Sequence, residues 1–112
     1  MDSSVIFVTP IPGIPIEQQQ RLGVLFAAET QLEEVWLFGS RAMGRHQDGS
    51  DIDCCLVGDQ LGHSDRLRLM AAIDDLLLPW QVDLALRQEL PQDLLAHLER
   101  VGRCIWRRGS PL

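Results

Sequence analysis

Hydrophobic positions recur along this chain with two spacings, one typical of helices and one typical of strands. Helical spacing marks residues 16–30, residues 65–78 after a Ser64 cap, and a last segment opened by Pro91. Shorter apolar stretches predict strands, which cover residues 33–39, 50–57, 80–86 and 103–107. Because the two kinds of element alternate, the pattern predicts an α/β (α+β) fold.

The same spacing predicts which side chains face the core. The expected inward residues are Leu22, Leu25 and Phe26 in the first helix, Leu69, Met70, Ile73, Leu76 and Leu77 in the second, and Leu94, Leu95, Leu98 and Val101 in the last. In the strand at 80–86, Val82, Leu84 and Leu86 share one face and Asp83 lies on the other. Residues 1–15 contain three prolines and one glycine, which predict an extended arm and a loop.

Length and charge narrow the class of protein. A chain of 112 residues supports one hydrophobic core, so residues 1–112 are expected to form a single domain. A formal charge of −6 disfavours a protein that coats nucleic acid, because phosphate binding depends on clustered Lys and Arg. The chain has no apolar run near the roughly 18 residues of a membrane span and no basic segment typical of a signal peptide. We therefore expect no membrane partner.

The three cysteines predict a reducing compartment. Cys54 and Cys55 are adjacent and Cys104 is alone, which is a poor disulfide framework and has no zinc spacing. We expect reduced thiols in a cytoplasmic protein, with Cys54 and Cys55 packed as small hydrophobic residues. The three tryptophans, Trp36, Trp80 and Trp106, are expected in the core or at an interface. His46 is expected to be a loop residue rather than a base.

Acidic residues interrupt two of the expected strands. Asp51 and Asp53 would share one face about 7 Å apart, where like charges repel unless a cation lies between them. Asp83 lies in a later strand that could pair beside this one and direct a third carboxylate to the same point. Mg²⁺ prefers such oxygen ligands, and two Mg²⁺ ions can stabilise the attacking and leaving oxygens of a phosphoryl transfer.

A glycine and a serine end the strand that precedes these acids. At Gly39 and Ser40 a turn would let phosphate approach the backbone and would offer N–H and hydroxyl donors. A Ser40 helix cap is the alternative, and it is compatible with anion binding. For Arg41, contact with phosphate and pairing with a nearby acid both remain open.

Together these residues form a motif that resembles the sequence motif of a known family. The pattern G-S-x10-D-x-D, read from Gly39 to Asp53, is similar to that of the nucleotidyltransferase superfamily that includes DNA polymerase β. The fuller pattern G-S-R-A-x-G-x5-S-D-I-D, which also contains Arg41 and Ser50, and the later V-D-L resemble the minimal nucleotidyltransferases (MNT domains). The resemblance implies a short mixed β-sheet flanked by helices.

The resemblance also implies an activity. It implies Mg²⁺-dependent transfer of AMP, or another NMP, from ATP or another NTP, with release of pyrophosphate. Asp51 and Asp53 would ligate two Mg²⁺ ions, while Asp83 would complete the metal site and act as the candidate general base. The β and γ phosphates would be held by Gly39 and Ser40, in a nucleotide site that includes Arg41 and Ser50.

The acceptor is expected on a partner, since this length leaves no room for an acceptor-binding domain. Minimal nucleotidyltransferases are commonly paired with a helical HEPN protein, in several pairs as the antitoxin that transfers AMP to a tyrosine of the toxin. This chain has no tyrosine, which fits transfer in trans. Two alternatives stay open. One is a module that neutralises its partner by occlusion with the nucleotide site idle, and the other is an aminoglycoside-type adenylyltransferase whose cleft a homodimer would supply.

Overall fold

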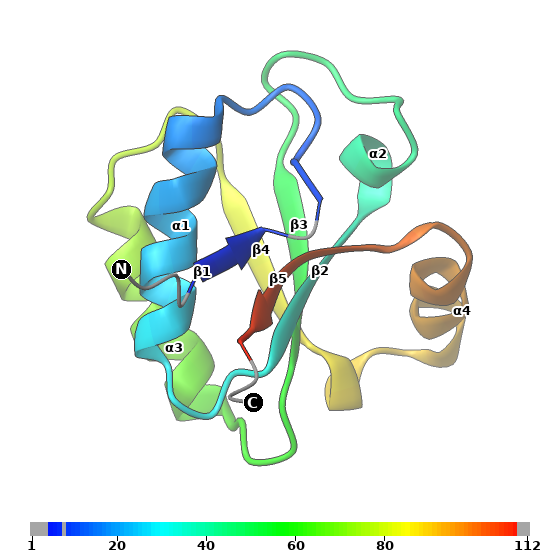
Figure 1. Cartoon of the computed structure of the whole chain (residues 1–112). Coiled ribbons are helices and arrows are strands. Elements are labelled where there is room, and N and C mark those ends of the chain that lie inside the picture. The colour runs from blue at the N-terminus through cyan, green and yellow to red at the C-terminus, as the bar shows by residue number, and fades with distance from the viewer. Residues whose placement is uncertain (1–4, 8, 110–112) are drawn as a thin grey trace.

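A computed structural model describes residues 5–7 and 9–109 and shows one five-stranded sheet with helices on both faces (Figure 1). The elements in chain order are β1 (Val5–Phe7), α1 (Ile16–Ala28), β2 (Glu34–Phe38), α2 (Gly39–Ala42), β3 (Ile52–Val57), α3 (His63–Asp74), β4 (Val82–Leu86), the short 3₁₀ helix η1 (Arg87–Glu89), α4 (Gln92–Val101) and β5 (Arg103–Arg108). The predicted α/β (α+β) class is confirmed.

The sheet has the strand order β1-β5-β2-β3-β4. Every pair is antiparallel except β3 with β4, which is parallel, so the sheet is mixed as the resemblance implied. In this register Asp53 faces Phe38 across one strand pair and Asp83 across the other. The end of β2 and the starts of β3 and β4 therefore meet at one end of the sheet.

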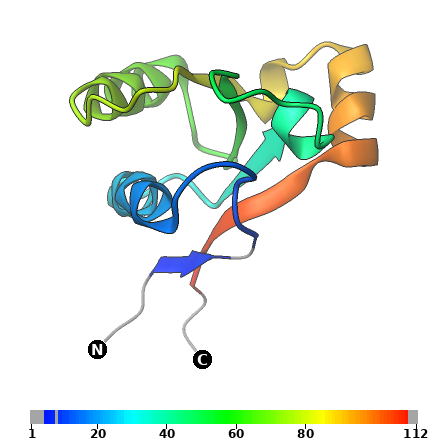
Figure 2. The ribbon, with the colours of Figure 1, turned by 90° about the horizontal axis from the view of Figure 1, so that it is seen from above.

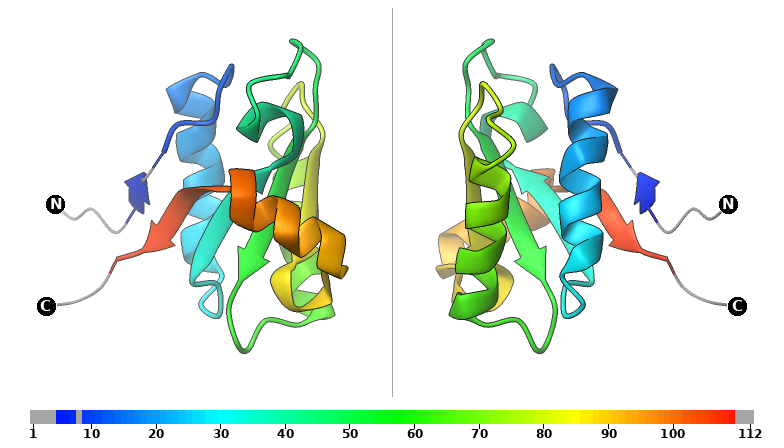
Figure 3. Two further views of the ribbon diagram at one scale, coloured as in Figure 1. Left: turned by 90° about the vertical axis from the view of Figure 1, so that its right-hand side faces the viewer. Right: turned by 90° about the vertical axis from the view of Figure 1, so that its left-hand side faces the viewer.

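The helices cover the two faces of the sheet unequally. Figure 2 shows α1 and α3 on one side and α4 on the other, and the two views of Figure 3 show each face in turn. Side chains of β3 alternate between these faces. Ile52, Cys54 and Leu56 belong to the core cluster with α1 and α3, so Asp53 points toward the α4 side. No helix within residues 5–7 and 9–109 is long and apolar enough to cross a membrane.

Most of the expected elements are present, but the predicted cap of α3 and two of the predicted inward residues were wrong. Ser64 is not the cap of α3, because the helix begins at His63 and the Asp65 carboxylate accepts a hydrogen bond from the Gly62 N–H at 2.9 Å. Leu77 lies beyond the end of α3 and is 86% exposed, while Leu94 is also exposed. The strand-like or extended arm expected at the start of the chain is confirmed at residues 5–7, which form β1 and pair with β5.

The cysteines and tryptophans lie largely as expected. All three thiols are free and buried. Burial raises the pKa of Cys54 and raises that of Cys55 to about 11, so both thiols pack as uncharged side chains. Trp106 is in the core, with its ring centroid 5.8 Å from that of Phe26, whereas Trp36 and Trp80 are partly exposed.

Candidate active site

Two of the predicted acids are direct neighbours on adjacent strands. Asp53 of β3 and Asp83 of β4 occupy paired positions in the parallel register, and both side chains are half-buried. The pKa of Asp53 is raised to about 6, first by burial, then by the charges of Asp83 and Asp51 and by a hydrogen bond with Asp83. Without a cation beside it, the Asp53 carboxyl group therefore holds its proton more strongly than an isolated aspartate would.

The third acid is placed differently from the expectation. Asp51 is exposed and precedes β3, which begins at Ile52, so Asp51 does not lie inside the strand. Its charge still contributes to the raised pKa of Asp53. Within residues 5–7 and 9–109, no three side chains of His, Cys, Asp or Glu form a cluster that could hold a metal ion without further ligands.

Gly39 lies against the Asp53 carboxylate. Its φ of +76° is in the left-handed region, and a Cβ built there would collide with Oδ2 of Asp53. Only glycine fits this position, for two independent reasons. The turn from β2 into α2 therefore brings backbone atoms directly over the acid, with half-buried Ser40 next to them.

His97 of α4 completes this turn, and its place in an amphipathic helix is the one sequence feature that could have pointed to it. The Gly39 N–H donates to Nε2 of His97 at 3.2 Å. The His97 ring also packs edge-on against Phe38, with centroids 6.3 Å apart and planes at 81°. The Gly39 N–H is thus already paired within the protein, and the donors expected to meet phosphate are the N–H and hydroxyl of the next residue, Ser40.

The Arg41 side chain is buried and forms hydrogen bonds within the protein. It is 1% exposed, and its guanidinium donates to the backbone carbonyls of Pro12, Asp48 and Ser50 at 2.8 to 3.3 Å. Neither alternative considered for this side chain, contact with phosphate or pairing with an acid, matches the arrangement. Arg41 instead stabilises the loop that carries Asp51 through these hydrogen bonds. In the same loop the Ser50 hydroxyl accepts a hydrogen bond from the Gln47 N–H at 2.8 Å.

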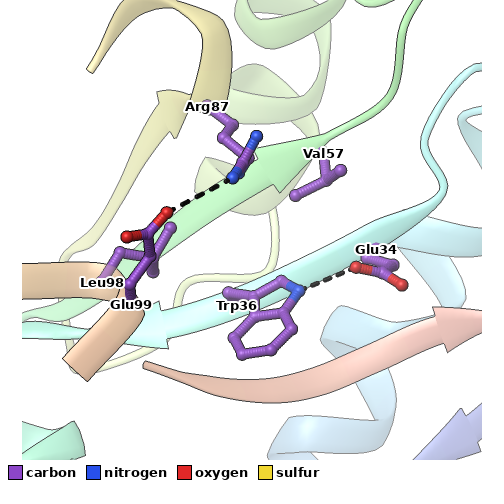
Figure 4. A pocket seen from close by; sticks show the side chains of 6 residues that line it. All are labelled: Glu34, Trp36, Val57, Arg87, Leu98 and Glu99. Atoms are coloured by element: carbon purple, nitrogen blue, oxygen red, sulfur yellow. Dashed lines mark hydrogen bonds and ion pairs between the residues drawn. The ribbon is translucent and has the colours of Figure 1, made fainter. Parts of the chain in front are cut away.

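Two pockets differ in their relation to the acids. One, of about 710 Å³, lies along α3, the α3–β4 connection and the start of β4, and Asp83 forms part of its lining. The other, of about 370 Å³, lies under α4 and is lined by Trp36, Leu98 and the Arg87–Glu99 pair (Figure 4). Val57, which also lines the second pocket, is four residues along β3 from Asp53, about 13 Å at the rise of a strand. The first pocket therefore adjoins the candidate site, and the second does not.

Comparison with known families gives one match over most of the chain. The family described as "Polymerase beta, Nucleotidyltransferase" matches residues 20–110, which include Gly39, Asp51, Asp53 and Asp83. A protein of Haemophilus influenzae described as "Probable protein adenylyltransferase MntA" is 41% identical over 51 residues. That match covers 45% of this chain and 45% of the relative, so the chain matches less than half of the relative's length.

Several solved structures with a similar fold come from toxin–antitoxin complexes. A crystal structure of a toxin–antitoxin with AMP-PNP has a TM-score of 0.66 at 23% identity, over 80% of this chain and 73% of that chain. The complex of a tri-AMPylated Shewanella oneidensis HEPN toxin with its MNT antitoxin has a TM-score of 0.59 at 22% identity, over 80% and 72% of the two chains. At these identities the likeness establishes the fold.

Proposed function

We propose that this chain, which belongs to the polymerase β nucleotidyltransferase family, transfers AMP from ATP to a hydroxyl group of a HEPN-type partner protein. The observation that carries the proposal is the pairing of Asp53 with Asp83 directly beside the Gly39 turn. This places carboxylate ligands and backbone donors at one end of the sheet. A phosphoryl group needs both in order to be held and attacked in line.

The acids fit Mg²⁺ by their chemistry. Asp53 and Asp83 are oxygen ligands that repel one another, and Mg²⁺ is usually held by one or two carboxylates together with substrate phosphates and water. Asp51, which the sequence predicts as a further metal ligand, and the nucleotide phosphates would supply the remaining ligands. When bound, two Mg²⁺ ions would neutralise the carboxylates and the charge that develops on the phosphate.

The residues of this chain then have distinct parts in the transfer. Gly39 and Ser40 would hold the β and γ phosphates: Gly39, whose own N–H donates to His97, would let them approach the backbone, and Ser40 would offer its N–H and hydroxyl. Asp83, whose Oδ1 accepts from Nε2 of Gln81 at 3.1 Å, would accept the proton of the acceptor hydroxyl. The acceptor oxygen forms a bond to the α phosphorus while the bond from that phosphorus to the β-phosphate oxygen breaks, and pyrophosphate leaves.

A protein acceptor is supported by three observations. The chain has no tyrosine of its own, and the similar Shewanella oneidensis complex contains an AMPylated HEPN toxin. The Haemophilus influenzae relative is itself described as a protein adenylyltransferase. The chain would then act as the antitoxin of a toxin–antitoxin pair. The three free thiols are compatible with work in the reducing cytoplasm.

Mass spectrometry of the purified proteins tests the proposal. The wild type, the HEPN protein encoded beside it, ATP and Mg²⁺ should give a partner whose mass rises by one AMP unit or a small multiple. The Asp53→Asn variant should give no increase. If that variant neutralises the partner as well as the wild type does and the partner never gains mass, occlusion replaces transfer as the function.

A further inference from the structure

Two side chains from different parts of the chain hold the loop that carries Asp51 at a single backbone atom. The Asp48 carbonyl accepts hydrogen bonds from the Arg41 guanidinium at 3.3 Å and from the Trp80 indole N–H at 3.0 Å. Arg41 belongs to α2, and Trp80 lies just before β4, the strand that carries Asp83. One carbonyl therefore joins the phosphate turn, the loop of the first acid and the strand of the last acid.

The position of Trp80 is set by the sheet and the core. Its ring is partly buried and packs against the hydrophobic core cluster, as do the side chains of Leu78 and Val82. The carbonyl of the next residue, Gln81, accepts a hydrogen bond from the Ile52 N–H at 2.8 Å. Because both the ring and the adjacent backbone have fixed contacts, the indole N–H is a fixed donor to the loop.

Asp51 depends on its loop for its position. It precedes β3, so strand pairing does not hold it, and its side chain is exposed. Within the part of the chain that the structure describes, no Arg or His forms an ion pair with it. Its charge contributes to the raised pKa of Asp53, which shows that the two carboxylates repel one another. Before Mg²⁺ binds, this repulsion favours a loop in which Asp51 lies further from Asp53, and the hydrogen bonds to the loop oppose it.

We infer that Trp80 is a positioning residue that holds Asp51 ready for Mg²⁺ through the Asp48 carbonyl. The inference rests on the metal site of the proposed function and adds to it a residue outside the glycine-serine and aspartate motifs. A ligand that is already in place when the metal arrives binds it more tightly than one that must first be ordered.

The Trp80→Phe variant tests this, because it removes the indole N–H and keeps an aromatic ring against the core. The measurement is the Mg²⁺ concentration that gives half of the maximal rise in melting temperature at saturating ATP. This midpoint should increase about three- to tenfold, as expected when one hydrogen bond behind a ligand is lost. At saturating Mg²⁺, KM for the partner protein should match that of the wild type.

A matched control and a double variant separate positioning from a general loss of structure. Trp36→Phe also removes a partly exposed indole N–H, which donates to Glu34 at 2.8 Å, and it should leave the Mg²⁺ midpoint unchanged. If Trp80 acts through Asp51, adding Trp80→Phe to Asp51→Asn should raise the midpoint no further.

The outcomes for this inference and for the proposed function are distinguishable. A Trp80→Phe midpoint equal to that of the wild type, with or without a lower melting temperature in the absence of Mg²⁺, would overturn the inference and leave the proposed function standing. The same increase in Trp36→Phe, or a further increase in the Asp51→Asn background, would also overturn it. If Trp80→Phe raises the midpoint but the wild type never modifies the partner, the proposed acceptor is overturned and the role of Trp80 stands. A wild type that ATP plus Mg²⁺ does not stabilise would overturn both.

Discussion

Replacing Asp53 by asparagine should make the metal-free protein more stable at neutral pH while abolishing AMP transfer. The carboxyl group has a pKa of about 6 instead of the ordinary 3.8, so the folded state resists its ionisation. At about 1.4 kcal/mol per pKa unit the full cost would be about 3 kcal/mol. Solvent screening at this half-exposed site reduces it to about 1–2 kcal/mol. For a domain of this size, that corresponds to roughly 5 °C in melting temperature.

The sign of the pH dependence follows from proton binding. Between pH 4 and pH 6 the folded protein holds a proton at Asp53 that the unfolded chain has released, so the free energy of unfolding should fall as pH rises through this window. Above pH 6 the loss is complete. The Asp53→Asn variant should lack this fall and should therefore exceed the wild type in stability at pH 7 to 8.

Urea unfolding from pH 4 to pH 8 without metal measures both effects. Asp59→Asn is the matched control, since it removes the same charge from an exposed residue just beyond the other end of β3. It should leave the pH profile unchanged. An Asp53→Asn variant that is less stable than the wild type at pH 8, or that keeps the same pH profile, would refute the account of crowded carboxylates. Adding ATP and Mg²⁺ should stabilise the wild type much more than Asp53→Asn.

Three further substitutions or treatments have definite expected results. Gly39→Ala should lose AMP transfer and cost about 2 kcal/mol or more in urea unfolding, because it adds left-handed strain and a collision with Asp53. His97→Ala should raise KM for ATP and lower the free energy of unfolding by about 1 kcal/mol, because the Gly39 N–H loses its acceptor. His97→Gln should recover part of the KM and part of the stability. Unchanged kinetics in His97→Ala would contradict the role of His97 in positioning Gly39. Iodoacetamide at pH 8 should leave Cys54 unmodified in the folded protein by peptide mass mapping, because burial keeps its thiol neutral, whereas rapid labelling would contradict its packing.

Patterns of short range were enough to predict most of the fold. Alternating apolar residues predicted β3 and β4, and the spacing of Gly39, Asp53 and Asp83 predicted that these residues lie together, because strand periodicity and turn residues act within a few positions. The pairing of Asp53 with Asp83 needed one assumption, that the two strands are neighbours. The structure confirms it.

Features that depend on distant segments were not predictable. His97 meets Gly39 across 58 positions of sequence, and Arg41 meets the Pro12 carbonyl across 29. A guanidinium beside a glycine-serine turn looks the same in sequence whether it contacts phosphate or backbone carbonyls. Leu77 fitted the helical spacing, and only the turn after Asp74 removed it from the core.

The position of β5 in the sheet has a consequence for how the chain folds during synthesis. Residues 103–108 lie between β1 and β2, so the β1 strand has no neighbour in the sheet until β5 has been made. On the ribosome, β2, β3 and β4 can pair first, while the edge of β2 stays unpaired until β5, which follows η1 and α4 in the chain, has been made. Pairing between strands that are far apart in sequence slows folding, and until β5 pairs with β2 the unpaired edge of β2 is open to aggregation. A chain released before residue 103 would lose an internal strand rather than an edge, and would expose the Trp106 side of its core.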